Sequence, residues 1–257
     1  MNHGIPNLGN TCFFNACTQA LAASSHLILR LNKYAQPGTF DMTMKRLFET
    51  NGSSEVIREI FSVIHTHLGS AGSAAEVCGK MLELLSPKIR EGIEAEVEEE
   101  NVCTKCGEKT SYSRKQLITI VPPINGKYEP NTFLTNIGLQ KTNPEGYKCK
   151  NDLAVANHKT IITFLPNTFI CESTPVDHIN IRSILSMPER FTIPNSTYVY
   201  EKVSEVLYVP GHYFALCKSP SAGGGWNIYN DSSVMPSKDL IRRGNAIPTM
   251  VVFQRVF

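Results

Sequence analysis

A cysteine near the start of the chain has the surroundings of a reactive thiol. Cys12 follows a glycine-containing stretch, 4–11, and opens an apolar run, 12–23, with helical spacing. Thr11 is the expected N-cap of this helix. At a helix start, unpaired N–H groups and the positive end of the helix dipole favour the thiolate, which is the attacking species. A lone cysteine is also commonly a small buried hydrophobic residue, and this stretch by itself leaves both interpretations open.

A histidine near the other end of the chain could supply the base that a thiol nucleophile needs. His212 begins one apolar stretch, and Asn230 and Asp231 follow the next one, 226–229. In an antiparallel hairpin of two such strands, the histidine and the Asn-Asp pair can face each other. An amide or carboxylate oxygen would accept from one ring nitrogen and leave the other for the thiol. A lone histidine is more often a structural residue, but the second strand beside it weakens that alternative.

The elements expected around these residues indicate an α+β fold. Apolar positions at helical spacing predict helices over 55–68 and 73–85, and Ser86-Pro87 ends the second of them. The acidic stretch 94–100 is expected to be a solvated strand or loop. Further along, short β-branched stretches between turn residues predict a mainly antiparallel sheet with strands at 116–121, 159–165, 168–172, 198–208, 212–217, 226–229 and 249–253.

Composition excludes several functional classes. The 257 residues are 42% hydrophobic and 19% charged with a net charge of +2, which favours a globular fold and gives no electrostatic case for nucleic acid or an anionic membrane. No segment approaches the ~18 consecutive apolar residues of a membrane helix. The start lacks the basic and apolar regions of a secretory signal, so we expect an intracellular protein of the cytoplasm, the nucleus or both. The eight cysteines are then expected to be metal ligands, nucleophiles or core residues rather than disulfides.

Two motifs resemble those of a known enzyme family. The run Gly-Ile-Pro-Asn-Leu-Gly-Asn-Thr-Cys-Phe-Phe-Asn-Ala around Cys12 resembles the cysteine box of the ubiquitin-specific proteases. A second motif resembles the histidine box of the same family: Gly211-His212-Tyr213, followed by Trp226-x-x-Tyr229-Asn230-Asp231-x-x-Val234. The two motifs occur in the order in which the family has them. The resemblance implies a papain-like cysteine protease fold in one catalytic domain, 1–257. It would have a helical thumb (1–90) followed by an antiparallel β palm and β fingers (91–257).

The resemblance also implies a role for each site residue. Cys12 would be the nucleophile, His212 the general base and acid, and Asn230 the residue that orients the imidazole. Asn7 matches the side-chain amide that donates to the oxyanion, and Asp231 matches a second acid that assists polarisation. Which of Asn230 and Asp231 matters more is left open.

By this resemblance the protein is a thiol-dependent deubiquitinase. It would hydrolyse isopeptide or peptide bonds at the C-terminal glycine of ubiquitin, need no cofactor for catalysis, and have ubiquitin or ubiquitinated proteins as partners; the oligomeric state is left open. Departures from the family pattern keep a protease for a ubiquitin-like modifier as an alternative: Cys171-Glu172-Ser173 replaces the usual Arg-Phe, and the loop 208–210 is short. An inactive ubiquitin-binding scaffold is less favoured, because both nucleophile and base are present.

A second cysteine pattern raises the question of a structural metal. Cys103 and Cys106 form a CxxC, a spacing that lets two thiolates bind one zinc ion. Members of the family often hold zinc at the tips of the fingers, and Cys149 and Asp152 match the second ligand pair. His158 is another candidate for the fourth ligand. The alternative is a finger hairpin without metal.

Overall fold

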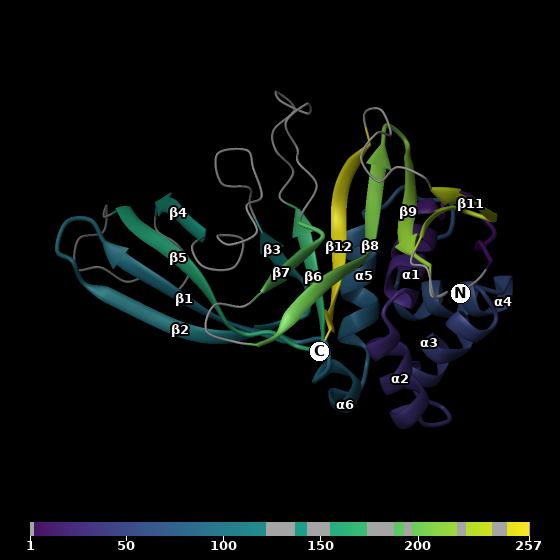
Figure 1. The fold of residues 1–257 in the computed structure, drawn as a ribbon, viewed down its shortest axis with the longest axis horizontal. Coiled ribbons are helices and arrows are strands. Elements are labelled where there is room, and N and C mark those ends of the chain that lie inside the picture. The colour runs from purple at the N-terminus through teal and green to yellow at the C-terminus, as the bar shows by residue number, and fades with distance from the viewer. Residues whose placement is uncertain are drawn as a thin grey trace.

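Helices at one end of the molecule are followed by two sheets, one in the middle and one at the other end (Figure 1). This computed structural model describes residues 3–121, 137–142, 155–173, 188–192, 197–219, 225–237 and 246–256. In these ranges every helix lies before residue 91 and every strand after it. The helices are α1 (Cys12–Ala22), α2 (Ser25–Tyr34), α3 (Phe40–Glu49), α4 (Ser54–Val63), α5 (Ala74–Glu83) and α6 (Pro87–Arg90).

Serine side chains begin three of these helices. Ser24, Ser53 and Ser73 precede α2, α4 and α5, and each hydroxyl accepts a hydrogen bond from a backbone N–H of the first helical turn. Such caps satisfy one of the N–H groups that a helix start leaves unpaired. Pro87 opens α6, where its missing N–H costs nothing.

The helix predictions are confirmed in part. α1 and α5 match the predicted helices closely, but α4 ends at Val63 rather than near residue 68, and His65 has a left-handed φ of 51°. The prediction that Thr11 is the N-cap of α1 is confirmed in position, but its hydroxyl accepts from Leu8 N at 3.0 Å and makes no capping bond to α1. Helices α2 and α3 were not predicted.

The middle of the molecule is an eight-stranded sheet, here called the palm sheet. Its order is β11-β10-β9-β8-β12-β6-β3 with β7 paired to β8, and all pairs are antiparallel except β3–β6. A separate four-stranded antiparallel sheet, here called the finger sheet, has the order β2-β1-β5-β4. The strands are β1 (Ala95–Cys103), β2 (Lys109–Gln116), β3 (Thr119–Val121), β4 (Ile137–Thr142), β5 (Val155–Phe164), β6 (Thr168–Ser173), β7 (Arg190–Thr192), β8 (Val199–Val209), β9 (His212–Lys218), β10 (Trp226–Asn230), β11 (Ser233–Ser237) and β12 (Ile247–Val256).

The acidic stretch 94–100 forms most of strand β1. Alternate residues of β1 are buried, so the expectation of a solvated segment is wrong for Glu99, which is 5% exposed. The Glu99 carboxylate accepts hydrogen bonds from Tyr112 and Arg114 on β2. These charge-assisted bonds are what allow a carboxylate to be buried in the finger sheet.

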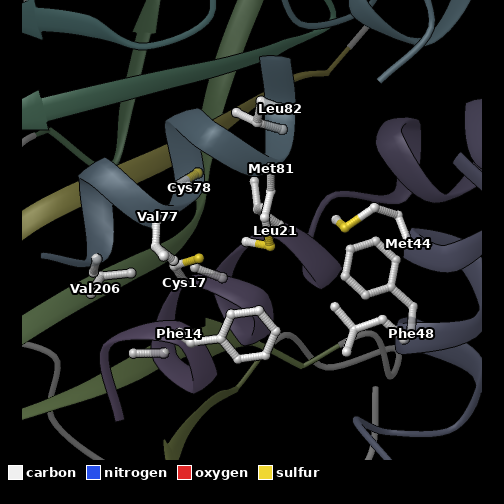
Figure 2. Packing of buried hydrophobic residues seen from close by; sticks show 14 of the residues in the cluster. Phe14, Cys17, Leu21, Met44, Phe48, Val77, Cys78, Met81, Leu82 and Val206 are labelled. Carbon is white, nitrogen blue, oxygen red and sulfur yellow. The ribbon is translucent and has the colours of Figure 1, made fainter. Parts of the chain in front are cut away.

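Helix α1 is the central element of the core. Every residue from Cys12 to Leu21 is buried, because α1 packs on β8 and β9 and also on α5. Figure 2 shows Cys17 and Leu21 of α1 beside Val77 and Met81 of α5, with Phe48 of α3 in the same cluster. Two side chains from the palm sheet hold the far part of α1: Ser204 donates to Ala20 O at 2.7 Å, and the Cys217 thiol lies 3.5 Å from Gln19 O. The position of α1 on the sheet is therefore fixed by both apolar packing and hydrogen bonds.

Among the described residues, no helix is long and apolar enough to cross a lipid bilayer.

Candidate active site

The starts of α1 and β9 lie at the same end of the palm sheet. Asn15, in the first part of α1, donates to Asp231 Oδ1 at 2.7 Å, and the neighbouring Asn230 bonds His212 at the start of β9. At the other end of both elements, Gln19 lies beside Cys217. Helix α1 and strand β9 therefore run in the same direction, and the ends that carry Cys12 and His212 lie at the same end of the palm sheet.

His212 is oriented by the strand beside it. Its Nε2 lies 2.6 Å from Asn230 Oδ1, and strands β9 and β10 pair in an antiparallel register that brings the start of one near the end of the other. An amide oxygen can only accept, so Nε2 carries the proton and the Nδ1 lone pair is available as a base. This is the contact across a hairpin that the sequence predicts.

Asn7 is held by a tight local turn before α1. Its Oδ1 accepts from Gly9 N at 3.0 Å and from Thr11 N at 3.1 Å, while Gly9 has a φ of +96°. The Nδ2 group donates to Asp231 Oδ2 at 2.9 Å. Because an amide nitrogen has two hydrogens, one N–H of Asn7 is committed to Asp231 and the other remains for a further acceptor.

Asp231 connects the turn after β10 to the N-terminal part of the chain. It lies in the two-residue turn between β10 and β11 with a φ of 50°, and its backbone oxygen accepts from Ile5 N at 2.9 Å. Its carboxylate accepts from Asn7 through one oxygen and from Asn15 through the other. The turn thus binds both the segment before α1 and α1 itself.

Cys12 lies at the start of a helix, whereas three other thiols are enclosed in the core. Burial raises the pKa of the thiols of Cys17, Cys171 and Cys217, which keeps these side chains in the unreactive thiol form. Cys12 is the first residue of α1, the hydroxyl of Thr11 does not cap that helix, and its first turn contains no acidic residue. The backbone N–H groups of this turn are therefore available to negative charge at the sulfur or at a nearby oxygen.

Two tyrosines border the same region. The rings of Tyr208 and Tyr213, on β8 and β9, have their centroids 4.9 Å apart. Burial raises the pKa of the Tyr213 phenol, and the groups of Tyr208, Cys12 and Glu172 add smaller effects in the same direction. Burial also raises the pKa of Glu172 on β6. The surroundings of Cys12 are thus partly desolvated, which strengthens electrostatic interactions with a bound substrate.

The structure joins His212 to Asn230 and Asn7 to Asp231 by hydrogen bonds, and it places Cys12 at the start of α1, at the same end of the palm sheet. Sequence reasoning missed Asn15, which links α1 to Asp231. Its position three residues after Cys12, on the same side of the predicted helix, was the available signal.

The proposed metal ligands lie in and near the finger sheet. Cys103 ends β1 and Cys106 lies in the β1–β2 turn, in which Gly107 N donates to Cys103 O at 3.0 Å and Lys105 N donates to Cys103 Sγ at 3.4 Å. Such a turn with an N–H directed at sulfur fits one half of a zinc site. Cys149 and Asp152 lie outside the described residues; for His158 only the backbone, in β5 opposite Asn101, is described. No group of three or more metal-binding side chains occurs within the described ranges.

Comparison with known proteins gives a structural likeness without a sequence match. No protein-family model and no curated protein sequence matches the chain. A chain in the structure of the SAGA DUB module Ubp8/Sgf11/Sus1/Sgf73, with a variant Ubp8 and bound to monoubiquitin, superposes with a TM-score of 0.73 at 17% identity, over 99% of this chain and 69% of that chain. A chain in the same module bound to ubiquitin aldehyde gives 0.73 at 15% identity, over 99% and 70%.

The likeness extends over nearly the whole chain and defines the fold class. The helical end, the palm sheet and the finger sheet together form a mixed α and β fold of the ubiquitin-specific-protease type, the fold of Ubp8. The expected fold class is confirmed.

Gly4 tests the contact between the segment before α1 and the β10–β11 turn. A Cβ atom at this position would lie 2.1 Å from Asp231 O and 2.4 Å from Ser232 C, both backbone atoms. We expect Gly4→Ala to lower the free energy of unfolding by about 1–3 kcal/mol, measured by urea denaturation, because the segment must move away from the turn. In the matched control, Gly225→Ala, the new Cβ meets no described atom within 4 Å, and we expect no loss of stability. A Gly4→Ala protein as stable as the wild type would contradict the described contact.

Proposed function

We propose that this protein is a thiol-dependent deubiquitinase that hydrolyses isopeptide or peptide bonds at the C-terminal glycine of ubiquitin. The observation that carries the proposal is the hydrogen bond between His212 and Asn230, made at the sheet end where Cys12 begins α1. A thiol at a helix start, an imidazole with a free Nδ1 and an amide that orients the imidazole are the parts of a cysteine protease site.

In the proposed first step, Nδ1 of His212 takes the Cys12 proton and the sulfur attacks the carbonyl carbon of the terminal glycine. The tetrahedral intermediate then breaks its C–N bond, and the leaving amine takes the proton from His212. The product is a thioester between Cys12 and the modifier. In the second step His212 removes a proton from water, which attacks the thioester and releases a carboxylate and the free thiol.

The proposed oxyanion site consists of the second N–H of Asn7 and the backbone N–H groups at the start of α1. Asn7 is suited to this role because its oxygen and its other N–H are already bonded, to the 9–11 turn and to Asp231. Donors that are fixed before the reaction stabilise developing negative charge without reorganisation.

Ubiquitin is proposed as the partner on two grounds. The two similar structures are described as bound to monoubiquitin and to ubiquitin aldehyde. Cys12 is only 8% exposed, so an extended and narrow peptide reaches it more readily than a folded surface. A flexible tail that ends in small residues has the required shape.

The direct test is covalent capture by ubiquitin that carries a C-terminal electrophile. We expect Cys12 to be the labelled residue, with cleavage of a ubiquitin C-terminal reporter abolished in Cys12→Ala and reduced about 10²–10⁴-fold in His212→Ala. The exposed His67 provides a matched control, and His67→Ala is expected to retain wild-type activity. Full activity in either site variant, with an unchanged fold, would exclude the mechanism.

Asn230 and Asn7 are predicted to act on kcat rather than on KM. Asn230→Ala removes the acceptor for Nε2–H and should lower kcat by up to about 10²-fold, while Asn230→Asp keeps an acceptor and should retain most of the activity. Asn7→Ala removes an oxyanion donor and should lower kcat about 10²–10³-fold. Steady-state kinetics with the ubiquitin reporter measures both effects. Equal activity of Asn230→Ala and Asn230→Asp would show that the contact with His212 does not orient the base.

A modifier other than ubiquitin is the second candidate substrate. The favouring observation is Glu172, a half-buried carboxylate on β6. This residue belongs to the stretch that departs from the family pattern. Parallel reporter assays with ubiquitin and ubiquitin-like modifiers decide between the two.

A structural zinc ion in the fingers is a separate proposal. Cys103 and Cys106 would provide two thiolates, with Cys149 and Asp152 or His158 as the remaining candidates. Elemental analysis of the purified chain should give one zinc per molecule, and Cys106→Ser should lose it. A metal-free wild-type protein with a native melting temperature would contradict this proposal.

A further inference from the structure

Asn15 is a buried polar residue in the first part of α1, on the element that carries Cys12. It is 1% exposed, and its Nδ2 lies 2.7 Å from Asp231 Oδ1 and 3.3 Å from the backbone oxygens of Ile5 and Pro6. One amide group therefore contacts both the segment before α1 and the turn after β10. These two parts of the chain carry Asn7 and Asn230.

The Asn15 side chain is suited to holding Asp231 and poorly suited to stabilising the core. Its Oδ1 is buried with no hydrogen-bond partner among the described residues, which is unfavourable for folding. The bond from its Nδ2 to the carboxylate is short and charge-assisted, a strong class of hydrogen bond. The Asn15 amide has an oxygen without a partner and a nitrogen well placed to donate to Asp231. This combination points to a role in orienting Asp231 rather than in stabilising the fold.

The carboxylate of Asp231 would rotate about its Cβ–Cγ bond without this contact. With Oδ1 bonded to Asn15, the other oxygen, Oδ2, is fixed at 2.9 Å from Asn7 Nδ2. The orientation of the Asn7 amide depends in turn on that bond, because its free N–H points away from the one that Asp231 accepts.

From this geometry we infer that Asn15 is a positioning residue: acting through Asp231, it orients the Asn7 amide toward the oxyanion of the reaction. The inference rests on the proposed function for its catalytic meaning. Asn15 itself touches neither the substrate nor the reacting atoms. Its effect passes through two hydrogen bonds, from Asn15 to Asp231 and from Asn7 to Asp231.

The kinetic test is a double-mutant cycle between Asn15→Leu, which keeps the approximate volume, and Asn7→Ala. We expect Asn15→Leu to lower kcat about 10–10²-fold in the wild-type background with KM for the ubiquitin reporter unchanged, because a small misplacement of a catalytic group has effects of this size. In the Asn7→Ala background the same substitution should lower kcat by less than about threefold, because the group it positions is already absent.

The matched control is Thr18→Val, which changes a fully buried polar residue one turn further along α1 without altering its shape. We expect wild-type kcat for this variant. Equal effects of Asn15→Leu in both backgrounds, or an equal loss of kcat in Thr18→Val, would overturn the inference in favour of a merely structural role.

A second measurement needs no substrate. The side-chain amide resonances of Asn7, followed by NMR, should move toward free-amide values in Asn15→Leu and stay in place in Thr18→Val. If the wild-type chain cleaves no reporter but the Asn7 resonances respond in this way, the proposed function fails while the positioning role stands. If the resonances do not respond, the positioning role is wrong even in an active enzyme.

Asp231→Asn is the alternative test variant should Asn15→Leu fail to fold. The new amide has one oxygen and can accept from only one of Asn7 and Asn15 in the present arrangement, so kcat should fall and Asn7→Ala should add less than about threefold to the loss. Fully additive losses in this pair would also overturn the inference.

Discussion

The candidate site depends on the contact between the segment before α1 and the two-residue turn after β10. Ile5 N bonds Asp231 O, and the backbone packs so closely at Gly4 that no side chain fits there. This contact places Asn7 beside Asp231, and Asp231 follows directly after the residue that orients His212. The proposed oxyanion donor and the proposed base are therefore positioned by one turn.

Helix α1 supplies the third part of the site, and its position is set independently by the core. It is buried along nearly its whole length between the palm sheet and α5, so its start moves little relative to β8 and β9. The proposed nucleophile, Cys12, is the first residue of this packed helix. The buried amide of Asn15 then connects this rigid element to the turn.

The site joins the segment 5–15 to residues 212–231, so it is complete only when α1 has packed against strands β9 and β10. Contacts between residues 5–15 and 212–231 close most of the polypeptide into one loop, and the loss of chain entropy must be offset by the packing of α1 on the sheet. The fold is shared with the similar structure of the Ubp8-containing module at 17% identity. A pattern of buried positions on strands and helices survives such divergence more readily than individual residues do.

Several features of the chain could be predicted from the sequence because they depend on neighbouring residues. Helical spacing after Cys12, the strand that begins with His212 and the strand over 226–229 are all local patterns, and the structure has each of them. Strand β2 escaped prediction because it is polar and mostly exposed, without the alternation of a half-buried strand. Burial of Glu99 and the bond from Asn15 to Asp231 were decided only by the tertiary structure. The packing of α1 on the sheet decides that Asn15 meets the half-buried carboxylate of Asp231. The type and neighbours of a residue carry no information about a partner more than two hundred positions away.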